Sequence, residues 1–372
     1  MTLVKDITDQ IEKLSPLAYA EDFDNVGLLV GDDAQEVTGV LVALDCLENT
    51  VQEAIDKDCN LIVAFHPIIF KGLKKINGKN YVERVVIKAV KNDIAIYAMH
   101  TALDNSIKGV SAKMAEVIGL QNCKVLLPQK GHLKKLTTYV PESEADAVRK
   151  ALFEAGAGHI GDYSNCSFNM TGEGTYLGNE NTKPSVGKPG SFEKVNETFI
   201  TVIFEAHLQS KILKALWTDH PYEEVAYDIV SLDNVHERIG MGIIGELNKP
   251  LSPANFFEHL KRTFNLQVIR HSDIGKKELK KVALLGGSGS FAIEKAMAAG
   301  ADIFVTADLK YHDFYRAENK LILADIGHYE SEQFTKNLLV EFLTKKITNF
   351  APALPEGRII LSKNNTNPIN YF

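Results

Sequence analysis

Three short apolar runs, two near the N-terminus and one near the C-terminus, are each followed by histidines and carboxylates. The side chains after these runs are His66, His100 with Asp104, and His328 with Glu332. Each run is typical of a buried parallel strand, and open α/β sheets bind ligands at the carboxyl ends of such strands. Imidazoles and carboxylates gathered there suit a divalent-metal centre with nitrogen and oxygen ligands.

The spacing at the C-terminal end supports a metal centre better than any single residue does. His66 precedes Pro67, which restrains its backbone, and such a histidine taken alone is more often packed or hydrogen-bonded than metal-bound. His328 and Glu332 strengthen the hypothesis, because a spacing of four places both side chains on one face if a helix begins near Tyr329. Taken together, these residues favour a metal centre.

The sequence does not decide the role of two other groups of residues. His100 and Asp104 also have a spacing of four, but the loop geometry does not fix their relative direction. Asp22, Asp24 and Asn25 lie just before a glycine, where they either form a turn or reach the site. The sequence does not separate these alternatives.

Two loops in the C-terminal part add further polar groups. Segment 286–290 (Gly-Gly-Ser-Gly-Ser) follows an apolar run, as phosphate-binding turns do, but matches neither the dinucleotide fingerprint nor the P-loop. We favour a tight turn that lets helix and strand approach closely. Segment 306–312 includes Lys310 and His312; we expect a supporting or substrate-binding role at the same rim, with plain solvent exposure as the alternative.

The elements that must position these residues alternate between helix and strand in both outer parts of the chain. In the N-terminal part we expect helices over 4–14, 47–57, 81–92 and 110–118 and strands over 37–44, 61–64 and 94–99. In the C-terminal part we expect helices over 253–263, 291–299 and 331–345 and strands over 281–285, 303–306 and 321–324. This alternation predicts parallel sheets with helices on both faces.

The middle of the chain has a different order. Between residues 134 and 231 the pattern predicts β-α-β-β-α-β, the ferredoxin-like arrangement. Within it, His220 and Pro221 are interpreted as the end of a helix rather than as a catalytic motif. We therefore expect an α/β fold of two similar halves interrupted by an α+β insert. The expected domains are 1–130, 131–235 and 236–372.

The bulk composition narrows the functional classes. A length of 372 residues predicts two or three domains. The net charge of -7 and a pI near 5.9 argue against nucleic acid as a partner, and lysines 71, 74, 75 and 79 are interpreted as a solvated loop. Four scattered cysteines are typical of reduced thiols rather than of disulfides or a cysteine zinc site. Without an apolar leader or membrane span, we expect a cytoplasmic protein.

Several ordered motifs of this chain resemble those of the Nif-three-like family, whose members are called GTP cyclohydrolase 1 type 2 homologues. The motifs are Glu-Asp-Phe-Asp-Asn-Val-Gly-Leu (21–28), His-Pro-Ile-Ile-Phe-Lys-Gly (66–72), His-Thr-Ala-Leu-Asp (100–104), Gly-Gly-Ser-Gly (286–289), Thr-Ala-Asp-Leu-Lys-Tyr-His (306–312) and His-Tyr-Glu-Ser-Glu (328–332). The resemblance covers both outer parts of the chain. The insert resembles the PII/CutA-like module of the longer bacterial members.

The resemblance implies a dinuclear centre in a ring-shaped homohexamer, with one or two divalent ions, zinc expected, in each subunit. The implied metal ligands are His66, Asp104, His328 and Glu332. Phe65 stands where the family has the first of two successive histidines, so that water or His100 would have to replace one ligand. Ala102 and Ala307 replace an asparagine and a glycine that are usual in the family, which implies a different cavity rim.

Two functions follow as hypotheses. The first is metal-assisted hydrolysis of a nucleotide-like or other phosphorylated heterocycle, with Asp104 bridging two ions and Glu332 as a terminal ligand that also accepts a proton. Lys310 and His312 would hold a phosphate or protonate a leaving group. The second is a non-catalytic metal-binding or regulatory assembly, which Phe65 and the insert favour. A DNA-associated ring lacks the basic charge that it would need.

Overall fold

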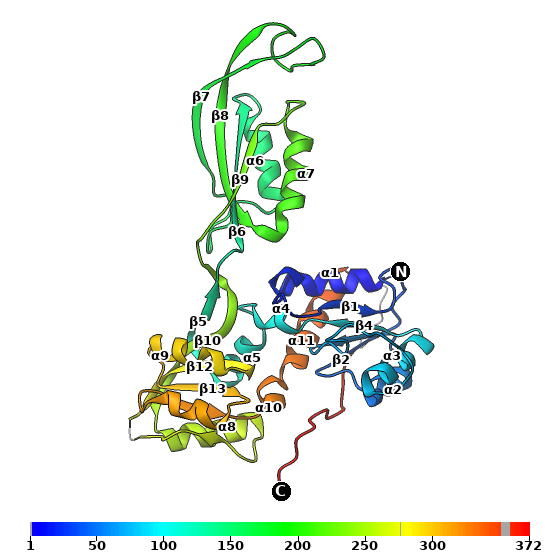
Figure 1. Ribbon diagram of the computed structural model, residues 1–372, viewed down its shortest axis with the longest axis vertical. Coiled ribbons are helices and arrows are strands. Elements are labelled where there is room, and N and C mark those ends of the chain that lie inside the picture. Colours follow the sequence, from blue (N-terminus) through cyan, green and yellow to red (C-terminus); the bar gives the residue numbers. More distant parts are fainter. Residues whose placement is uncertain (1, 276, 351–357) are drawn as a thin grey trace. The chain divides into compact units, whose positions relative to one another are not determined.

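The computed structural model describes residues 2–275, 277–350 and 358–372. It divides into two compact units. The first unit comprises Met1–Leu127 and Arg238–Phe372, and the second comprises Pro128–Glu237. In Figure 1 the second unit is the mainly green part of the ribbon that carries β6 to β9.

The first unit contains a five-stranded sheet in the order β1-β4-β3-β2-β15. Its strands are β1 (Gly27–Val30), β2 (Val40–Ala43), β3 (Leu61–Ala64), β4 (Ala95–Ala98) and β15 (Ile359–Leu361). All neighbours are parallel except β1, which is antiparallel to β4. β2, β3 and β4 are buried along their whole length, because helices cover both faces of a parallel sheet.

Two pairs of helices cover the two faces of this sheet, and alternate side chains along each strand pack against opposite pairs. The helices are α1 (Val4–Leu14), α2 (Glu48–Asp56), α3 (Tyr81–Lys91) and α11 (Thr335–Phe350). Val40, Val42 and Val63 pack with α1 and α11, whereas Leu41 and Ile62 pack with α2 and α3. The alternation follows from the period of two along a strand.

A six-stranded sheet in the order β11-β14-β13-β12-β10-β5 completes the first unit. Its strands are β5 (Gln121–Gln129), β10 (His236–Leu251), β11 (Arg270–His271), β12 (Leu279–Ser288), β13 (Ile303–Ala307) and β14 (Ile322–Asp325). Helices α5 (Val110–Ile118) and α8 (Pro253–Phe264) cover one face, and α9 (Ile293–Ala298) with the 3-10 helix η4 (Tyr311–Ala317) covers the other. β12, β13 and β14 are parallel.

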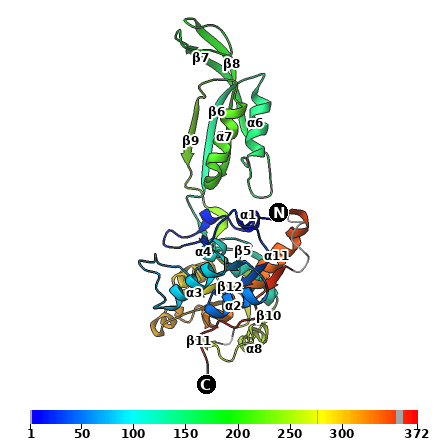
Figure 2. The same cartoon turned by 90° about the vertical axis from the view of Figure 1, so that its right-hand side faces the viewer.

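The two sheets repeat one arrangement and share segments of chain. In each, a run of parallel strands (β15, β2, β3 and β4 in the first sheet, β12, β13 and β14 in the second) lies beside an antiparallel edge strand, β1 next to β4 and β11 next to β14. α11 and β15 from the C-terminal part pack on the first sheet, and α5 and β5 from the N-terminal part pack on the second. Figures 1 and 2 show this interleaving of blue and orange segments. The two ends of the chain are therefore held together by a shared core.

Most of the predicted helices and strands of the outer parts agree with the structure. Helices 4–14 and 110–118 and strand 61–64 have the predicted bounds. The helix expected over 331–345 is instead two helices, α10 (His328–Glu332) and α11. Strands β1, β5, β10, β11 and β15 were not predicted. The remaining short helices are η1 (Leu17–Tyr19), α4 (His100–Asp104), η2 (Ala206–Leu208) and η3 (Ser290–Ala292).

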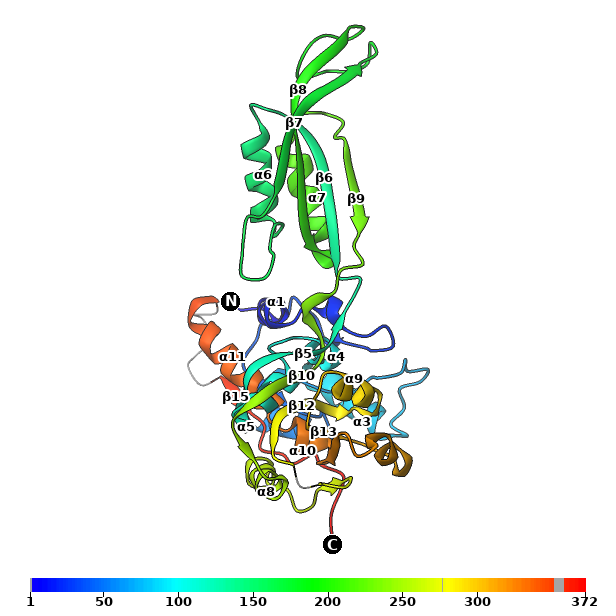
Figure 3. The same cartoon turned by 90° about the vertical axis from the view of Figure 1, so that its left-hand side faces the viewer.

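The second unit has the predicted β-α-β-β-α-β order. Its elements are β6 (Leu133–Pro141), α6 (Ala145–Glu154), β7 (Phe168–Leu177), β8 (Phe192–Glu205), α7 (Gln209–Asp219) and β9 (Tyr227–Ser231). The strands form an antiparallel sheet in the order β7-β8-β6-β9. Both helices pack on one face, through a core that includes Leu136, Val202 and Leu216 (Figure 3).

Three smaller predictions can be compared with the structure. α7 ends at Asp219, and His220 caps it directly before Pro221, as interpreted from the sequence. All four cysteines are free thiols, and lysines 71, 74, 75 and 79 are exposed. Within the described ranges, no helix combines the length and apolar character needed to cross a membrane.

Candidate metal centre

Histidines and carboxylates meet where the parallel strands of the two sheets end. Asp45 follows β2, His66 follows β3, and His100 begins α4 after β4. On the other sheet, Asp308 follows β13 and His328 begins α10 after β14. The parallel direction of these strands brings their carboxyl ends to one edge of each sheet. The shared core then brings the two edges together.

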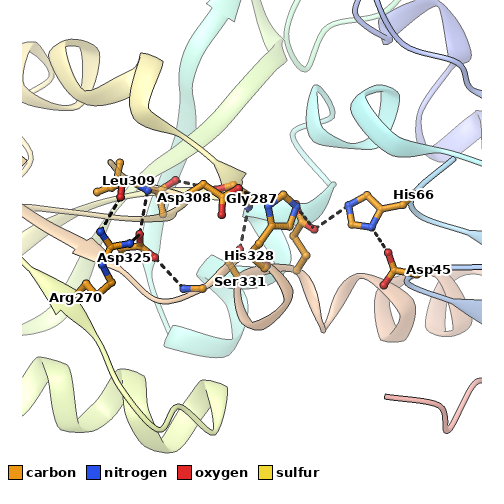
Figure 4. Close-up of polar contacts among 12 residues, drawn as sticks. Asp45, His66, Arg270, Gly287, Asp308, Leu309, Asp325, His328 and Ser331 are labelled. Atoms are coloured by element: carbon orange, nitrogen blue, oxygen red, sulfur yellow. Dashed lines mark hydrogen bonds and ion pairs between the residues drawn. The ribbon is translucent and has the colours of Figure 1, made fainter. Parts of the chain in front are cut away.

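His66, His328 and Glu332 form the centre of this cluster. His66 Nε2 lies 3.1 Å and His328 Nε2 lies 3.2 Å from the same Glu332 oxygen, Oε2. The ring centroids of the two histidines are 5.6 Å apart, and one ligand atom from each of the three residues lies within 4.8 Å of the others. In Figure 4, His66 and His328 point toward one another. The predicted meeting of the chain ends is confirmed.

A carboxylate behind each histidine fixes the direction of its ring. Asp45 Oδ1 lies 2.8 Å from His66 Nδ1, and Asp308 Oδ2 lies 2.7 Å from His328 Nδ1 (Figure 4). In a neutral imidazole oriented in this way, the carboxylate holds the Nδ1 proton and the Nε2 lone pair is directed at the centre. This is the usual way in which proteins orient histidine ligands. Asp45 was missed from the sequence, although it follows a buried strand just as His66 does.

The glycine loop at the end of β12 lets the Glu332 side chain approach the backbone closely. Gly287 has a φ of +67°, and a Cβ there would lie 2.4 Å from Glu332 Oε1. Its N–H donates to Ser331 Oγ at 2.9 Å, and Thr306 Oγ1 donates to its carbonyl at 3.1 Å. Because the N–H is already used inside the protein, the loop matches the tight turn that we favoured rather than a phosphate-binding turn.

The hydrogen bonding of Glu332 tests whether the site fits a metal ion. Its side chain is 4% exposed, and within the described structure Oε2 is buried without a hydrogen-bond partner. The Nε2 atoms of His66 and His328 are near enough for ion pairs but lie outside hydrogen-bond geometry. A buried carboxylate oxygen without a partner needs an explanation. Two imidazole nitrogens and one carboxylate facing one point are a donor set that fits a divalent cation.

The charges of the site favour a cation beside Glu332. Burial raises the pKa of the Glu332 carboxyl, but His328 and His66 outweigh burial and lower the pKa to about 2. Burial lowers the pKa of His66, but Asp45 and Glu332 outweigh it and raise the pKa to about 10. Asp308 and Glu332 raise the pKa of His328 to about 11 against the effect of burial. In the metal-free site both imidazoles therefore hold a proton next to Glu332, and a divalent cation would replace these two protons.

α4 carries two further residues to the same place. His100 and Asp104 both line a cavity of about 210 Å³, together with His328 and Glu332. The sequence left open whether the side chains of His100 and Asp104 point the same way, and both of them line one cavity. Burial and the Glu332 carboxylate raise the pKa of Asp104 well above its usual value. A role for Asp104 as a metal ligand stays a prediction.

Asp24 of the acidic loop both forms the turn, since its Oδ1 accepts from the Asn25 N–H, and reaches the site. Its Oδ1 lies 2.7 Å from His100 Nδ1, and the Thr101 N–H donates to its Oδ2 at 3.0 Å. Burial raises the pKa of Asp24, but hydrogen bonds from His100 and Thr101 lower it to about 2. Asn25 lies next to the site and donates to the carbonyl of Ile69. Asp24 thus orients His100 as Asp45 orients His66.

Comparison with known proteins assigns the family. A family model described as Duf34/NIF3 (NGG1p interacting factor 3) matches residues 2–368. The chain belongs to the Duf34/NIF3 family. The resemblance seen in the sequence motifs is therefore confirmed.

Relatives of this NIF3-family chain match it over almost their full lengths. A Bacillus subtilis protein named GTP cyclohydrolase 1 type 2 homolog is 37% identical over 369 residues, which cover 98% of each chain. A Halalkalibacterium halodurans protein of the same name is 37% identical over 97% of this chain and 96% of its own. The crystal structure of a Bacillus cereus protein related to NIF3 has a TM-score of 0.85 and 39% identity, covering 98% of both chains. A Staphylococcus aureus structure has a TM-score of 0.75 at 30% identity, covering 100% of this chain and 99% of its own.

In this NIF3-family site Phe65 is buried and in contact with two histidines. Its ring centroid lies 4.8 Å from that of His66 and 5.7 Å from that of His100, and the residue is 0% exposed. Phe65 therefore packs the histidine side chains but supplies no ligand atom.

Lys310 and His312 lie outside the cavity lining described above. Both are exposed, and the Lys310 backbone N–H donates to Asp313 at 2.8 Å at the start of η4. The His312 ring packs edge-on against Tyr311, with 5.1 Å between centroids. Their proposed contact with a substrate phosphate stays a prediction.

Proposed function

We propose that this NIF3-family protein is a divalent-metal-dependent hydrolase of a nucleotide-like substrate. His66, His328 and Glu332 would hold the ion, with Asp104 as a further ligand and zinc as the expected metal. The observation that carries the proposal is the buried Glu332 Oε2, which faces two imidazole nitrogens and has no hydrogen-bond partner in the described structure. The name of the relatives, GTP cyclohydrolase 1 type 2 homolog, supports the substrate class.

The proposed chemistry divides between the ion and the residues of the chain. When bound, a divalent cation lowers the pKa of a neighbouring water molecule toward 7. Glu332 balances the charge of the ion, and Asp45 and Asp308 keep the two imidazoles directed at it. Asp104 lines the same cavity and would add a second carboxylate, and burial and the Glu332 carboxylate raise its pKa, which favours its proton-bound form.

The walls of the cavity support a planar substrate group. Phe23 and Phe291 both line it and are mostly exposed. The ring centroids of Phe70 and Phe23 are 6.4 Å apart. Aromatic rings present flat apolar surfaces on which a heterocycle packs. Lys310 and His312, on the exposed η4 segment, would contact only a part of the substrate that extends out of the cavity.

The experiment is a metal count followed by a turnover assay. Metal per chain is measured by mass spectrometry of the purified protein, and GTP turnover is then measured with and without chelator. Glu332→Gln removes the charge with little change of shape, and Glu258→Gln, an exposed position in α8, is its matched control. We expect turnover to be lost with chelator and in Glu332→Gln and kept in the control. Turnover that survives both treatments contradicts the proposal.

The second candidate is a metal-binding assembly without turnover. Phe65 favours it, because a buried aromatic ring stands beside His66 where a further imidazole would complete a second metal position. Stable metal without turnover of GTP or other nucleotides would support this alternative.

We further propose that the chain forms a homohexamer and that residues 131–235 are a PII/CutA-like module. The strand order of the second unit, with two helices on one face, supports the module. Phe168 and Met170, two exposed apolar residues on the same face of the edge strand β7, support self-association because exposed apolar surface often marks an interface. Light scattering of the full chain tests the assembly, and a monomer would contradict it.

A further inference from the structure

The second unit contains its own cavity, of about 400 Å³. The end of β7, the connection that follows β7 and the segment after α7 line it, together with Tyr139 of β6 and Glu197 of β8. This volume is within the usual range of small-molecule sites. The cavity is lined entirely by residues of the second unit, so it is a different site from the candidate metal centre.

A carboxylate is held in the wall of this cavity. The Tyr222 hydroxyl donates to Glu197 Oε1 at 2.7 Å. On the neighbouring strand, a Cβ at Gly174 would lie 2.0 Å from Glu197 Oε2, so only a glycine leaves room for the carboxylate there. Burial and Glu197 raise the pKa of Tyr222, and its hydroxyl therefore remains a donor at neutral pH. Glu197 is positioned from both sides.

Aromatic rings surround this carboxylate. Tyr139, Tyr176 and Tyr222 all line the cavity, and the rings of Tyr176 and Tyr222 stand edge-to-face with centroids 6.0 Å apart. The Tyr176 hydroxyl donates to the carbonyl of Val186, which ties the connection after β7 to the strand. The faces of such rings attract cations.

The charge of the lining has one sign. Glu197, Glu223 and Glu224 line the cavity, and the described lining contains no lysine, arginine or histidine. Glu223 accepts a hydrogen bond from the Lys183 backbone N–H at 2.8 Å, which helps to close the cavity. An anion such as a nucleotide would meet three carboxylates without a compensating cation, whereas a positive ligand would meet favourable charge.

We propose that this cavity binds a small organic cation, an amine or quaternary ammonium with an apolar body. Its charge lies against Glu197 and its apolar body against Tyr176 and Tyr222. The arrangement combines a carboxylate with an aromatic enclosure, as in known sites for ammonium groups.

The test uses the full chain and three probes of similar size. Benzyltrimethylammonium, benzyl alcohol and benzoate are titrated into the protein by calorimetry. We expect the cation to bind and the neutral and anionic probes to bind at least roughly tenfold more weakly. This comparison needs no variant. Equal binding of the three probes overturns the proposal. Absence of cation binding also overturns it, including the case in which another copy of the chain fills the cavity.

Variants then locate the binding site. Glu197→Gln should weaken binding of the cation roughly tenfold, whereas Glu173→Gln, on β7 outside the lining, should leave it unchanged. Glu332→Gln at the metal centre should also leave it unchanged. Cation binding that is lost in Glu332→Gln and kept in Glu197→Gln overturns the inference. Neither outcome depends on metal content or turnover, so failure here is distinct from failure of the proposed hydrolase.

Discussion

Substitution of Gly287 by alanine tests the geometry of the proposed metal centre without changing a proposed ligand. Gly287 has a φ of +67°, and a Cβ there would lie 2.4 Å from Glu332 Oε1 and 3.3 Å from His328 Cε1. The nearer atom belongs to a buried side chain, so Glu332 must turn away from the two histidines. Gly119 is the matched control, because it has a φ of +85° and no heavy atom within 4 Å of an added Cβ.

The expected magnitudes follow from these contacts. A left-handed alanine costs about 1 kcal/mol of backbone strain, and this applies to both variants. Gly287→Ala also separates Glu332 from His66 and His328, and breaking a buried ion pair costs about 3 kcal/mol. We therefore expect Gly287→Ala to lose about 4 kcal/mol in the free energy of unfolding of the metal-free protein, and Gly119→Ala about 1 kcal/mol.

Metal affinity separates the two variants further. Displaced supporting contacts lower metal affinity by about 10- to 100-fold, so Gly287→Ala should bind metal at least tenfold more weakly, whereas Gly119→Ala should match the unsubstituted protein. Denaturant unfolding after chelation measures the first quantity, and competition with a chromophoric chelator measures the second. Equal metal affinity in the two variants would refute the geometric reasoning.

Three further predictions concern other parts of the first unit. Asp45→Asn should lower metal affinity about 10- to 100-fold with all ligands in place, because the His66 ring loses the carboxylate that orients it; the same chelator competition measures it. Phe65→His should raise the metal count per chain, because it adds an imidazole beside His66 and His100; mass spectrometry measures the count. Despite burial, Asp302 has a lowered pKa because Lys277 and backbone N–H groups bind its carboxylate. This group therefore contributes stability above the ordinary pKa of 3.8 and loses it as the pH falls through the lower folded value. Asp302→Asn should give a flatter loss of stability in acid, measured by denaturant unfolding between about pH 6 and 3.

Each of these predictions has a contrary result. Unchanged affinity in Asp45→Asn would mean that the carboxylate does not orient His66. An unchanged metal count in Phe65→His would mean that this position is not part of a second metal site. Glu278→Gln, at an exposed carboxylate, is the control for Asp302→Asn, and equal acid profiles of the two variants would contradict the role of Asp302.

The sequence determined the helices and strands that have strong hydrophobic periodicity. It also determined that the candidate site lies at the carboxyl ends of the parallel strands. The apolar run 61–64 predicts β3 with its observed bounds, and the rule that ligands lie at strand ends correctly brings His66 together with His328. The spacing of four between His328 and Glu332 correctly predicts one helical face, because α10 spans these two residues. These inferences depend on local patterns that a buried strand or a helical turn imposes directly on neighbouring residues.

Only the tertiary structure decided which side chains support the site. Asp24 lies 76 residues from His100, and Asp45 lies 21 residues from His66, so no local period connects the members of either pair. Strands of two to four residues such as β11 and β15 are too short to carry an alternating pattern, and their pairing comes from neighbours already in the sheet. The exchange of α11 and β5 between the two sheets is decided by packing of the shared core. That packing fixes where the two halves meet, and therefore which nitrogen atoms face the buried oxygen of Glu332.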